Sequence, residues 1–285
     1  MGLAEYKKKR RFSKTPEPGP QEKTSELGNI FVVQKHRATQ LHYDFRLEAD
    51  GVLKSWAVPK GPPMDPAVKR LAMQVEDHPV DYAEFEGVIP EGEYGGGTVM
   101  VWDIGVYAPE NTDNVSRALA KGELKFVLLG KKLKGSFVLV RTRERQWLLM
   151  KHKDEYAKEG EDITETQPYS VLTKRTLVEI AEDEGGDMKK AATGDPKKLP
   201  RRTGFEVLEW LRSQSAALSR IPVVMLTSSR HSVDVNRAYD LRANGYLTKP
   251  DTAQKLQEML LDFKRYWLRW NEAPELRAGS DPWMT

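Results

Sequence analysis

Cysteine is absent from the chain, which excludes disulfide bonds, cysteine-ligated zinc sites and thiol catalysis. No apolar run approaches the roughly 20 residues of a membrane span, and the N-terminal residues lack the apolar stretch of a signal peptide. Neither sign of charge dominates, since 45 basic and 42 acidic residues leave a net charge of +3. Any nucleic-acid-binding surface must therefore be local. These absences predict a cytoplasmic protein without a membrane partner.

Short apolar runs separated by glycine, proline and aspartate turns fill much of the first half of the chain. This pattern is typical of a β-barrel or a β-sandwich. Charged residues make up 31% of the sequence and gather outside these runs. The shifts in composition predict a flexible basic arm over residues 1–27, a mainly β domain over 28–172, a linker over 173–202 and an α/β segment over 203–285.

The N-terminal arm combines basic and aromatic residues. Six of the eight residues from Lys7 to Lys14 are basic, and Tyr6 and Phe12 lie beside or among them. Basic side chains can contact phosphates while aromatic rings stack on bases. The same composition is equally typical of a disordered, solvated leader.

One strand organises the β domain. From His42 onward, alternate residues are His42, Asp44, Arg46 and Glu48, whereas the residues between them are apolar. Side chains alternate between the two faces of a strand, so one face is polar and the other is apolar. The dipeptide Asp50-Gly51 predicts a hairpin turn, with residues 52–59 as the returning strand.

Imidazole and carboxylate groups ligate cations, and a guanidinium group binds phosphate. His36 precedes His42 by six residues, close enough to reach the same cation across a turn. Two imidazoles and one carboxylate are typical of a site for manganese or a similar divalent transition metal. Each residue taken singly is also explained by a structural role. The candidates for chemistry are His36, His42, Asp44, Lys60, Arg70, Glu76, His78 and Tyr82, with Arg46 and Lys60 as phosphate-binding residues and His78 as a proton donor or transition-state stabiliser.

Five motifs in this half extend the pattern beyond single residues. They are HYDFRLE from His42, SWAVPKGP from Ser55, KRLAMQVEDHPVDYAEFEG from Lys69, IPEGEYGGGTVMVWD from Ile89 and SVLTKRTL from Ser170. Together they resemble the 3′-phosphoesterase domain of bacterial LigD end-joining ligases, over about residues 5–180. The resemblance implies a small β-barrel and a manganese-dependent hydrolase of DNA repair. It would remove a 3′-terminal ribonucleoside to leave a 3′-phosphate, and then remove that phosphate to leave a 3′-hydroxyl.

The resemblance also assigns residue roles. It implies metal ligands at His36, His42 and Asp44, phosphate-binding positions at Arg46, Lys60 and Arg70, and catalytic positions at His78, Arg46, Tyr82 and Glu76, with Glu17 and Arg10 acting from the N-terminal arm. One position departs from the family, because its arm usually reads Arg-Asp-Phe where this chain has Arg10-Arg11-Phe12. The departure concerns the ribonucleoside-removing step and leaves the metal ligands unchanged.

Residues 203–285 resemble the C-terminal half of a response-regulator receiver domain. The motifs are FEVLEWLR from Phe205, IPVVMLTSS from Ile221 and NGYLTKP from Asn244, with Thr227 and Lys249 at the switch positions. The acidic pair and the strand that would deliver a phospho-acceptor aspartate are missing. Asp195 lies near that place but in a polar, turn-like sequence. About two strands of the receiver sheet remain, so we expect no signalling by phosphorylation.

Three functions therefore compete. The first is a metal-dependent 3′-end-processing phosphoesterase acting on DNA or RNA-tipped DNA ends, with a separate ligase and the Ku end-binding protein as the partners that the family implies. The second is a non-catalytic module that binds nucleic-acid ends. The third is a receiver-like signalling adaptor.

Overall fold

The computed structural model describes residues 2–199, 203–214 and 218–267. The chain divides into two compact units, residues 1–200 and residues 201–285. Within the described ranges, no helix is both long enough and apolar enough to cross a membrane.

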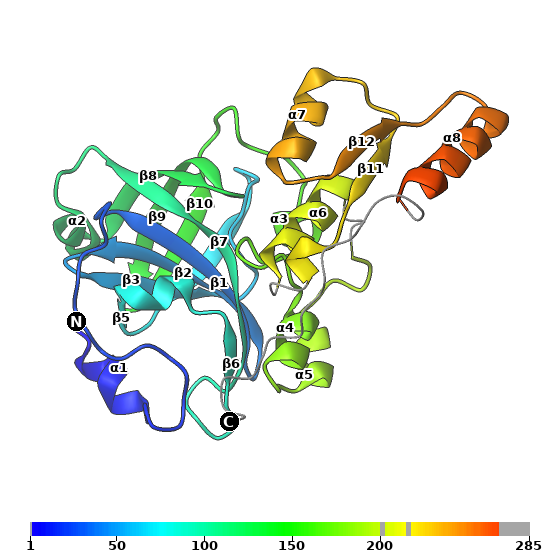
Figure 1. The fold of residues 1–285 in the computed structure, drawn as a ribbon. Helices are drawn as coiled ribbons and strands as arrows, with labels where there is room; N and C mark the ends of the chain where they lie inside the picture. The colour runs from blue at the N-terminus through cyan, green and yellow to red at the C-terminus, as the bar shows by residue number, and fades with distance from the viewer. Residues whose placement is uncertain (1, 200–202, 215–217, 268–285) are drawn as a thin grey trace, which may run out of the picture. The chain divides into compact units, whose positions relative to one another are not determined.

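The first unit is built on antiparallel strands (Figure 1). Its strands are β1 (Ile30–Arg37), β2 (Leu41–Ala49), β3 (Val52–Val58), β4 (Lys69–Gln74), β5 (His78–Pro79), β6 (Gly87–Ile89), β7 (Gly97–Glu110), β8 (Glu123–Gly130), β9 (Lys134–Arg143) and β10 (Gln146–Lys151). Its helices are α1 (Ala4–Lys9), the 3-10 helix η1 (Val80–Glu84), α2 (Val115–Lys121), α3 (Ile163–Thr166), α4 (Leu177–Asp183) and α5 (Met188–Ala192).

The sheet closes into a barrel because β1 pairs with β2 on one side and with β7 on the other. The strand order β1-β2-β3-β4-β10-β9-β8-β7 then returns to β1, while β5 adds to β3 and β6 to β7. A closed ring leaves no unpaired edge between its neighbouring strands. The prediction of a mainly β protein with a small barrel is confirmed.

The β2–β3 hairpin follows directly from the sequence. Asp50 and Gly51 have φ angles of 53° and 75°, which the tight two-residue turn requires and which glycine tolerates best. Ala49 then pairs with Val52, and the predicted returning strand is β3. At Gly97, where β7 begins, an added Cβ would collide with the carbonyl oxygen of Arg37. The glycine run therefore lets β7 approach the end of β1 closely.

The two faces of β2 have different surroundings. Tyr43, Phe45 and Leu47 are buried in the main hydrophobic core inside the barrel, as the alternation predicts. His42, Asp44, Arg46 and Glu48 lie on the outer face. A second apolar cluster covers part of this outer face, and it is formed by Leu3, Tyr6, Val32, Val52, Leu53, Tyr82, Ala83 and Val101. The polar residues of β2 therefore lie between the barrel wall and a covering layer.

The N-terminal arm differs from the flexible segment predicted for residues 1–27. Leu3 and Tyr6 belong to the second apolar cluster, which also contains Leu53 of β3, and the Tyr6 ring is fully buried. The Tyr6 hydroxyl donates to the Pro18 carbonyl oxygen at 2.6 Å. Local composition could not reveal this docking, because the apolar surface that holds Tyr6 comes from strands far along the sequence.

The segment predicted as a linker over residues 173–202 also differs. It contains α4 and α5, and its residues Leu177, Ile180, Ala181 and Ala191 belong to the main core. The carboxylate of Asp195 accepts from the backbone N–H groups of Leu177 and Val178 at 3.2 and 3.0 Å. These few apolar residues escaped prediction because charged residues surround them.

The second unit contains two parallel strands, three α-helices and one 3-10 helix in its described part. Their bounds are α6 (Gly204–Ser213), the 3-10 helix η2 (Leu218–Arg220), β11 (Val224–Thr227), α7 (Ser232–Asp240), β12 (Gly245–Thr248) and α8 (Ala253–Arg265). Within β11 only Met225 is buried. A two-stranded sheet is too small to cover both faces. Residues 268–285 of the predicted segment lie outside the described residues.

Candidate active site

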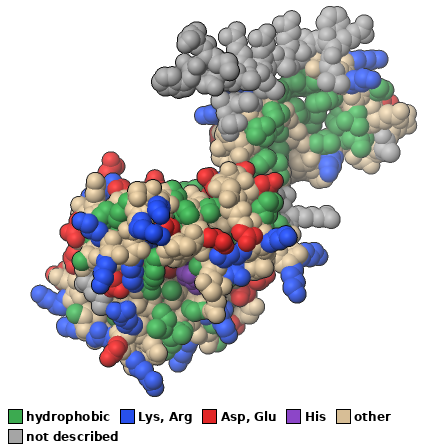
Figure 2. Space-filling model, turned by 90° about the horizontal axis from the view of Figure 1, so that it is seen from below, with side chains coloured by type: hydrophobic (Ala, Val, Ile, Leu, Met, Phe, Trp, Pro, Cys, Tyr) green, Lys and Arg blue, Asp and Glu red, His purple; other side chains and the backbone are tan. Residues whose placement is uncertain are grey.

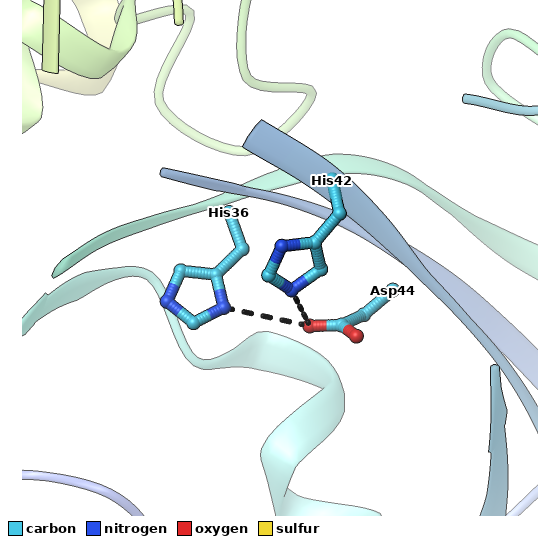
Figure 3. A group of neighbouring side chains, drawn as sticks. All are labelled: His36, His42 and Asp44. Atoms are coloured by element: carbon cyan, nitrogen blue, oxygen red, sulfur yellow. Dashed lines mark ion pairs between the residues drawn. The ribbon is translucent and has the colours of Figure 1, made fainter. Parts of the chain in front are cut away.

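The pairing of β1 with β2 places His36 directly opposite His42. Their ring centroids are 4.8 Å apart, and Asp44 follows on the same face of β2. Figure 3 shows both rings turned toward the Asp44 carboxylate. His36 Nδ1 lies 3.7 Å and His42 Nε2 lies 3.6 Å from Asp44 Oδ2. One atom from each of the three residues lies within 4.8 Å of the other two.

The opposite nitrogen of each imidazole is held by a backbone carbonyl. His36 Nε2 contacts the Gly95 oxygen at 2.8 Å, and His42 Nδ1 contacts the Gln40 oxygen at 3.1 Å. Because a carbonyl can only accept, these nitrogens carry the ring protons. The nitrogens that face Asp44 then present lone pairs, in the arrangement that orients histidines on metals. Two lone pairs and a carboxylate oxygen fit a divalent transition metal.

Electrostatics keep this group ready for a cation. Burial works to raise the pKa of Asp44, but Arg46 and His42 outweigh it and hold that pKa well below its usual range. Burial lowers the pKa of His36, which keeps its ring neutral. Burial also works to lower the pKa of His42, but Asp44 raises it overall. Proton and cation therefore compete for His42 Nε2.

Arg46 is fixed beside this group by contacts that the sequence did not reveal. Its Nε donates to Gln34 Oε1 at 2.8 Å, and its Nη1 donates to Ser55 Oγ at 2.9 Å. Its Nη2 lies 3.2 Å from Asp44 Oδ2, and its guanidinium lies 5.0 Å from the centroid of the Tyr82 ring. A guanidinium held at this many points is preorganised to bind an anion.

His78 is neutral and its tautomer is set by its neighbours. Burial is the main reason why its pKa lies well below the ordinary value, and the charges of Arg46 and Arg10 add to the shift. Its Nδ1 contacts the Glu76 carbonyl oxygen at 2.9 Å, so the ring proton lies there. Its Nε2 accepts from Arg10 Nη2 at 3.1 Å. In this arrangement His78 offers no proton on its Nε2 side.

The docked arm brings Arg10 to the site. Arg10 Nε donates to Glu17 Oε1 at 2.8 Å, and its Nη1 donates to Glu76 Oε1 at 3.2 Å. Glu17 also accepts from the Tyr82 hydroxyl at 2.9 Å. The guanidinium lies 3.9 Å from the centroid of the Tyr6 ring. Buried acidic groups and an aromatic ring thus compensate the burial of this cation.

These residues enclose a cavity of about 140 Å³. The predicted site residues that line it are Arg10, His36, His42, Asp44, Arg46, Glu76, His78 and Tyr82. Glu17 lies behind Arg10 and Tyr82 instead. Lys60 is exposed in the turn after β3, and Arg70 on β4 lies 3.6 Å from Asp162; neither lines the cavity.

Several residues of the site were missed at the level of sequence. Tyr94 and Gly95 line the cavity from the β6–β7 loop, and Gln34 and Ser55 hold Arg46 from behind. The alternation that identified His42 and Asp44 applies equally to β1, where Gln34 shares a face with His36. That signal was present in the sequence. Tyr94 and Gly95 lie in the motif that begins at Ile89, which helped to identify the family but assigned them no role.

Glu76 makes attachment of the arm sensitive to acid. Its carboxylate binds Lys9 Nζ at 3.0 Å as well as Arg10. Burial works to raise the pKa of Glu76, but hydrogen bonds, including one from Lys9, and the Arg10 charge lower it overall below 4.5. A carboxylate with a depressed pKa stabilises the folded state above its unfolded pKa, and loses that contribution as the pH falls through the folded value.

We therefore expect hydrogen exchange of residues 3–12 to accelerate as the pH falls below about 4.5, after correction for intrinsic exchange rates. Glu76→Gln should remove most of this pH dependence while raising exchange at neutral pH. Asp113→Asn, at an exposed acidic residue, is the matched control. An unchanged pH profile in Glu76→Gln would contradict the assignment.

Comparison with known proteins supports this reading of the first unit. Residues 34–141 match the family model of the DNA ligase D 3′-phosphoesterase domain. The sequence prediction of a LigD-type domain is confirmed. The multifunctional non-homologous end joining protein LigD of Pseudomonas aeruginosa is 44% identical over 256 residues, covering 86% of this chain and 28% of that protein. The LigD repair protein of Mycobacterium tuberculosis is 47% identical over 154 residues, covering 54% of this chain and 20% of that protein.

The chain thus spans less than a third of the length of these two LigD relatives. It carries a LigD-type 3′-phosphoesterase domain of the kind found in non-homologous end joining repair proteins.

The second unit matches a different family. Residues 197–261 match the response regulator receiver domain. Response regulator Rcp1 of Synechocystis is 41% identical over 70 residues, covering 25% of this chain and 47% of that protein. A crystal structure of Rcp1 is 38% identical, covering 27% of this chain and 55% of that chain, with a TM-score of 0.25. The match to about half of a receiver agrees with the partial segment that the sequence predicts.

Proposed function

We propose that the first unit is a manganese-dependent phosphoesterase that processes 3′ ends in DNA repair. It would remove 3′-terminal ribonucleosides and 3′-phosphates from DNA to leave a 3′-hydroxyl. The observation that supports this most directly is the group of His36, His42 and Asp44 at a cavity that also contains two fixed guanidinium groups. Cation ligands and anion-binding groups at one small cavity are what phosphoryl transfer requires.

The proposal gives each side chain a part. His36, His42 and Asp44 would hold the cation, which when bound supplies Lewis-acid polarisation of a phosphoryl oxygen. Arg46 and Arg10 would bind the remaining phosphoryl oxygens and offset the charge that develops on them. Lys60 and Arg70 do not line the cavity. We assign them to backbone phosphates of the DNA substrate that lie farther from its 3′ end.

His78 is proposed to stabilise the transition state through Arg10. Its Nε2 accepts from the Arg10 guanidinium, so the His78 ring orients that guanidinium toward the cavity. A proton-donating role would need the ring proton to move from Nδ1. Tyr82 and Glu76 are proposed to orient the same guanidinium groups, the first under Arg46 and the second against Arg10.

The decisive experiment uses the purified chain with Mn²⁺ and two 5′-labelled primer–templates. One primer ends in a single 3′-ribonucleotide and the matched primer ends in a 3′-phosphate. Conversion of both to a 3′-hydroxyl, lost in His42→Ala, is the expected result. Dephosphorylation without ribonucleoside removal would restrict the activity to 3′-phosphates. The missing ribonucleoside-removing step would then be attributed to Arg11 in the arm. No product from either primer, with DNA still bound, would replace the proposal by a module that binds nucleic-acid ends.

Joining of the processed ends is assigned to other proteins. The two LigD relatives are described as multifunctional end-joining proteins, and this chain spans only a part of each. We propose a separate DNA ligase and Ku as the partners at a processed end.

The second unit is proposed not to signal by phosphorylation, which argues against a signalling adaptor. The side chain of Asp195, the aspartate nearest the expected acceptor position, is only 7% exposed and is bound to Lys35 and two backbone amides. Incubation with a small phosphodonor such as acetyl phosphate is therefore expected to give no aspartyl phosphate, as measured by intact mass. Stable labelling, removed by Asp195→Asn, would contradict this prediction.

A further inference from the structure

Arg11 is the one arm residue that departs from the LigD pattern, and its side chain does not line the cavity. Its Nη2 lies 2.6 Å from Glu93 Oε1 and its Nε lies 3.0 Å from Glu93 Oε2. Two parallel hydrogen bonds between guanidinium and carboxylate fix the relative orientation of both groups. The Glu93 side chain is only 9% exposed, whereas that of Arg11 is 59% exposed.

Glu93 belongs to the β6–β7 loop, residues 90–96, which contributes Tyr94 and Gly95 to the lining of the cavity. The Glu93 N–H donates to the Pro90 oxygen at 3.2 Å, and its own carbonyl accepts from Gly96 at 3.0 Å. The next residues of the loop are Tyr94 and Gly95, both of which line the cavity. Displacement of Glu93 would therefore move the carbonyl that holds His36.

Neighbouring arm residues bind other parts of the cavity rim. Lys9 contacts Glu76 at 3.0 Å and the Tyr94 hydroxyl at 3.3 Å, and Arg10 reaches Glu76 and His78. Arg11 adds a charged contact to the loop. On the face seen in Figure 2, basic and acidic side chains are interspersed over the first unit.

The cavity beside the arm and the β6–β7 loop is small. Its volume of about 140 Å³ lies below the roughly 300–1,000 Å³ of pockets that enclose a whole organic ligand. A phosphate group needs less room than a nucleoside. The distance between the arm and the β6–β7 loop therefore limits which kind of 3′ end can enter the cavity.

We propose that the Arg11–Glu93 ion pair is a specificity-determining contact, which fastens the arm to the β6–β7 loop and favours a 3′-phosphate end over a 3′-ribonucleoside end. Arg11 acts as a positioning residue, through Arg10 on the arm and through Gly95 on the loop. An aspartate at position 11 would repel Glu93 and loosen the same contact. The substrate part of this inference rests on the proposed function, whereas the fastening of the arm does not.

The test begins with hydrogen exchange of the full chain, without metal or substrate. Arg11→Ala and Glu93→Ala are each expected to accelerate exchange in residues 3–12 and 90–97 by roughly two- to fivefold, the range for an exposed ion pair. The charge-swapped double variant Arg11→Glu with Glu93→Arg should return exchange toward the original rate. Lys14→Ala, at another exposed basic residue of the arm, is the matched control, and peptides from β8 and β9 report that the barrel remains folded.

Two results would contradict the proposal that Arg11 and Glu93 hold the arm to the loop. One is an unchanged exchange rate in both single variants. The other is a charge-swapped double variant whose exchange rate increases by as much as the two single variants combined. The second measurement compares kcat/KM for the two labelled primers. Arg11→Ala and Arg11→Asp should raise the ratio of ribonucleoside removal to phosphate removal, and an unchanged ratio would overturn the specificity. A chain inactive on both primers would refute the proposed function, while the exchange data would still decide the fastening.

Discussion

Replacing Asp44 with asparagine, or His42 with alanine, is expected to lower Mn²⁺-dependent phosphate release by at least about 100-fold. Loss of residues that merely support metal ligands already lowers metal affinity or activity by about 10–100-fold, so loss of a ligand should cost more. Asp44→Asn also removes the negative charge that faces Arg46 Nη2 at 3.2 Å. Both the proposed cation site and the position of the Arg46 guanidinium, which we propose binds phosphate, would change.

Two measurements separate these effects from unfolding. Binding of Mn²⁺, followed by electron paramagnetic resonance of the free ion, should weaken in both variants, while thermal unfolding without metal should show that the barrel persists. His152→Ala is the matched control, because that ring contacts Ser136 and lies outside the cavity. Wild-type activity in His42→Ala would refute the assignment of the metal centre.

Replacing Asp195 with alanine is expected to destabilise the first unit by about 3 kcal/mol, the lower end of the cost of breaking a buried ion pair. Lys35 Nζ lies 3.6 Å from Asp195 Oδ1, and their side chains are 1% and 7% exposed. Burial raises the pKa of Asp195 and lowers that of Lys35, and each charge limits the shift of the other. Removing the carboxylate leaves a buried ammonium group without this partner, and it also frees two backbone N–H groups at the start of α4.

Thermal denaturation should show this loss as a decrease in Tm of about 6–12 °C for a unit of this size. Asp113→Ala, at an exposed aspartate, should leave Tm unchanged. Adding Lys35→Met to Asp195→Ala should recover part of the loss, because the uncompensated charge is then gone. A Tm change below about 2 °C in the single variant would mean that residues 173–199 are indeed a linker, as their composition predicts.

The sequence predicted the grouping of His36, His42 and Asp44 because it depends on local periodicity. His42 and Asp44 lie two residues apart on one strand, and His36 reaches them across a short turn, so no distant information was needed. The hairpin at Asp50 and Gly51 was predictable for the same reason. The five motifs then identified the family, which no periodicity could have done.

What was not predictable depends on contacts between distant segments. Gln34 and Ser55 hold Arg46 from two neighbouring strands. Alternation places Gln34 on the same face as His36, but neither residue type indicates a contact with Arg46. Docking of the arm depends on the second apolar cluster, in which Tyr6 joins residues of β1, β3 and β7. The start of α4 is bound by Asp195, which also pairs with Lys35. Lys60 and Arg70 were predicted from their motif positions, yet neither lines the cavity. A motif position alone does not determine where a side chain lies.

The same buried ion pair has a consequence for synthesis of the protein. Strand β1 lacks some of its native contacts until β7 has paired with it and Asp195 has formed the ion pair with Lys35. At roughly 5–20 residues per second, a ribosome needs roughly 10–40 s to add the residues up to that point. During this interval the growing chain exposes barrel strands that still lack their neighbours. We therefore expect the nascent first unit to need protection from aggregation until residues beyond 195 have left the ribosome.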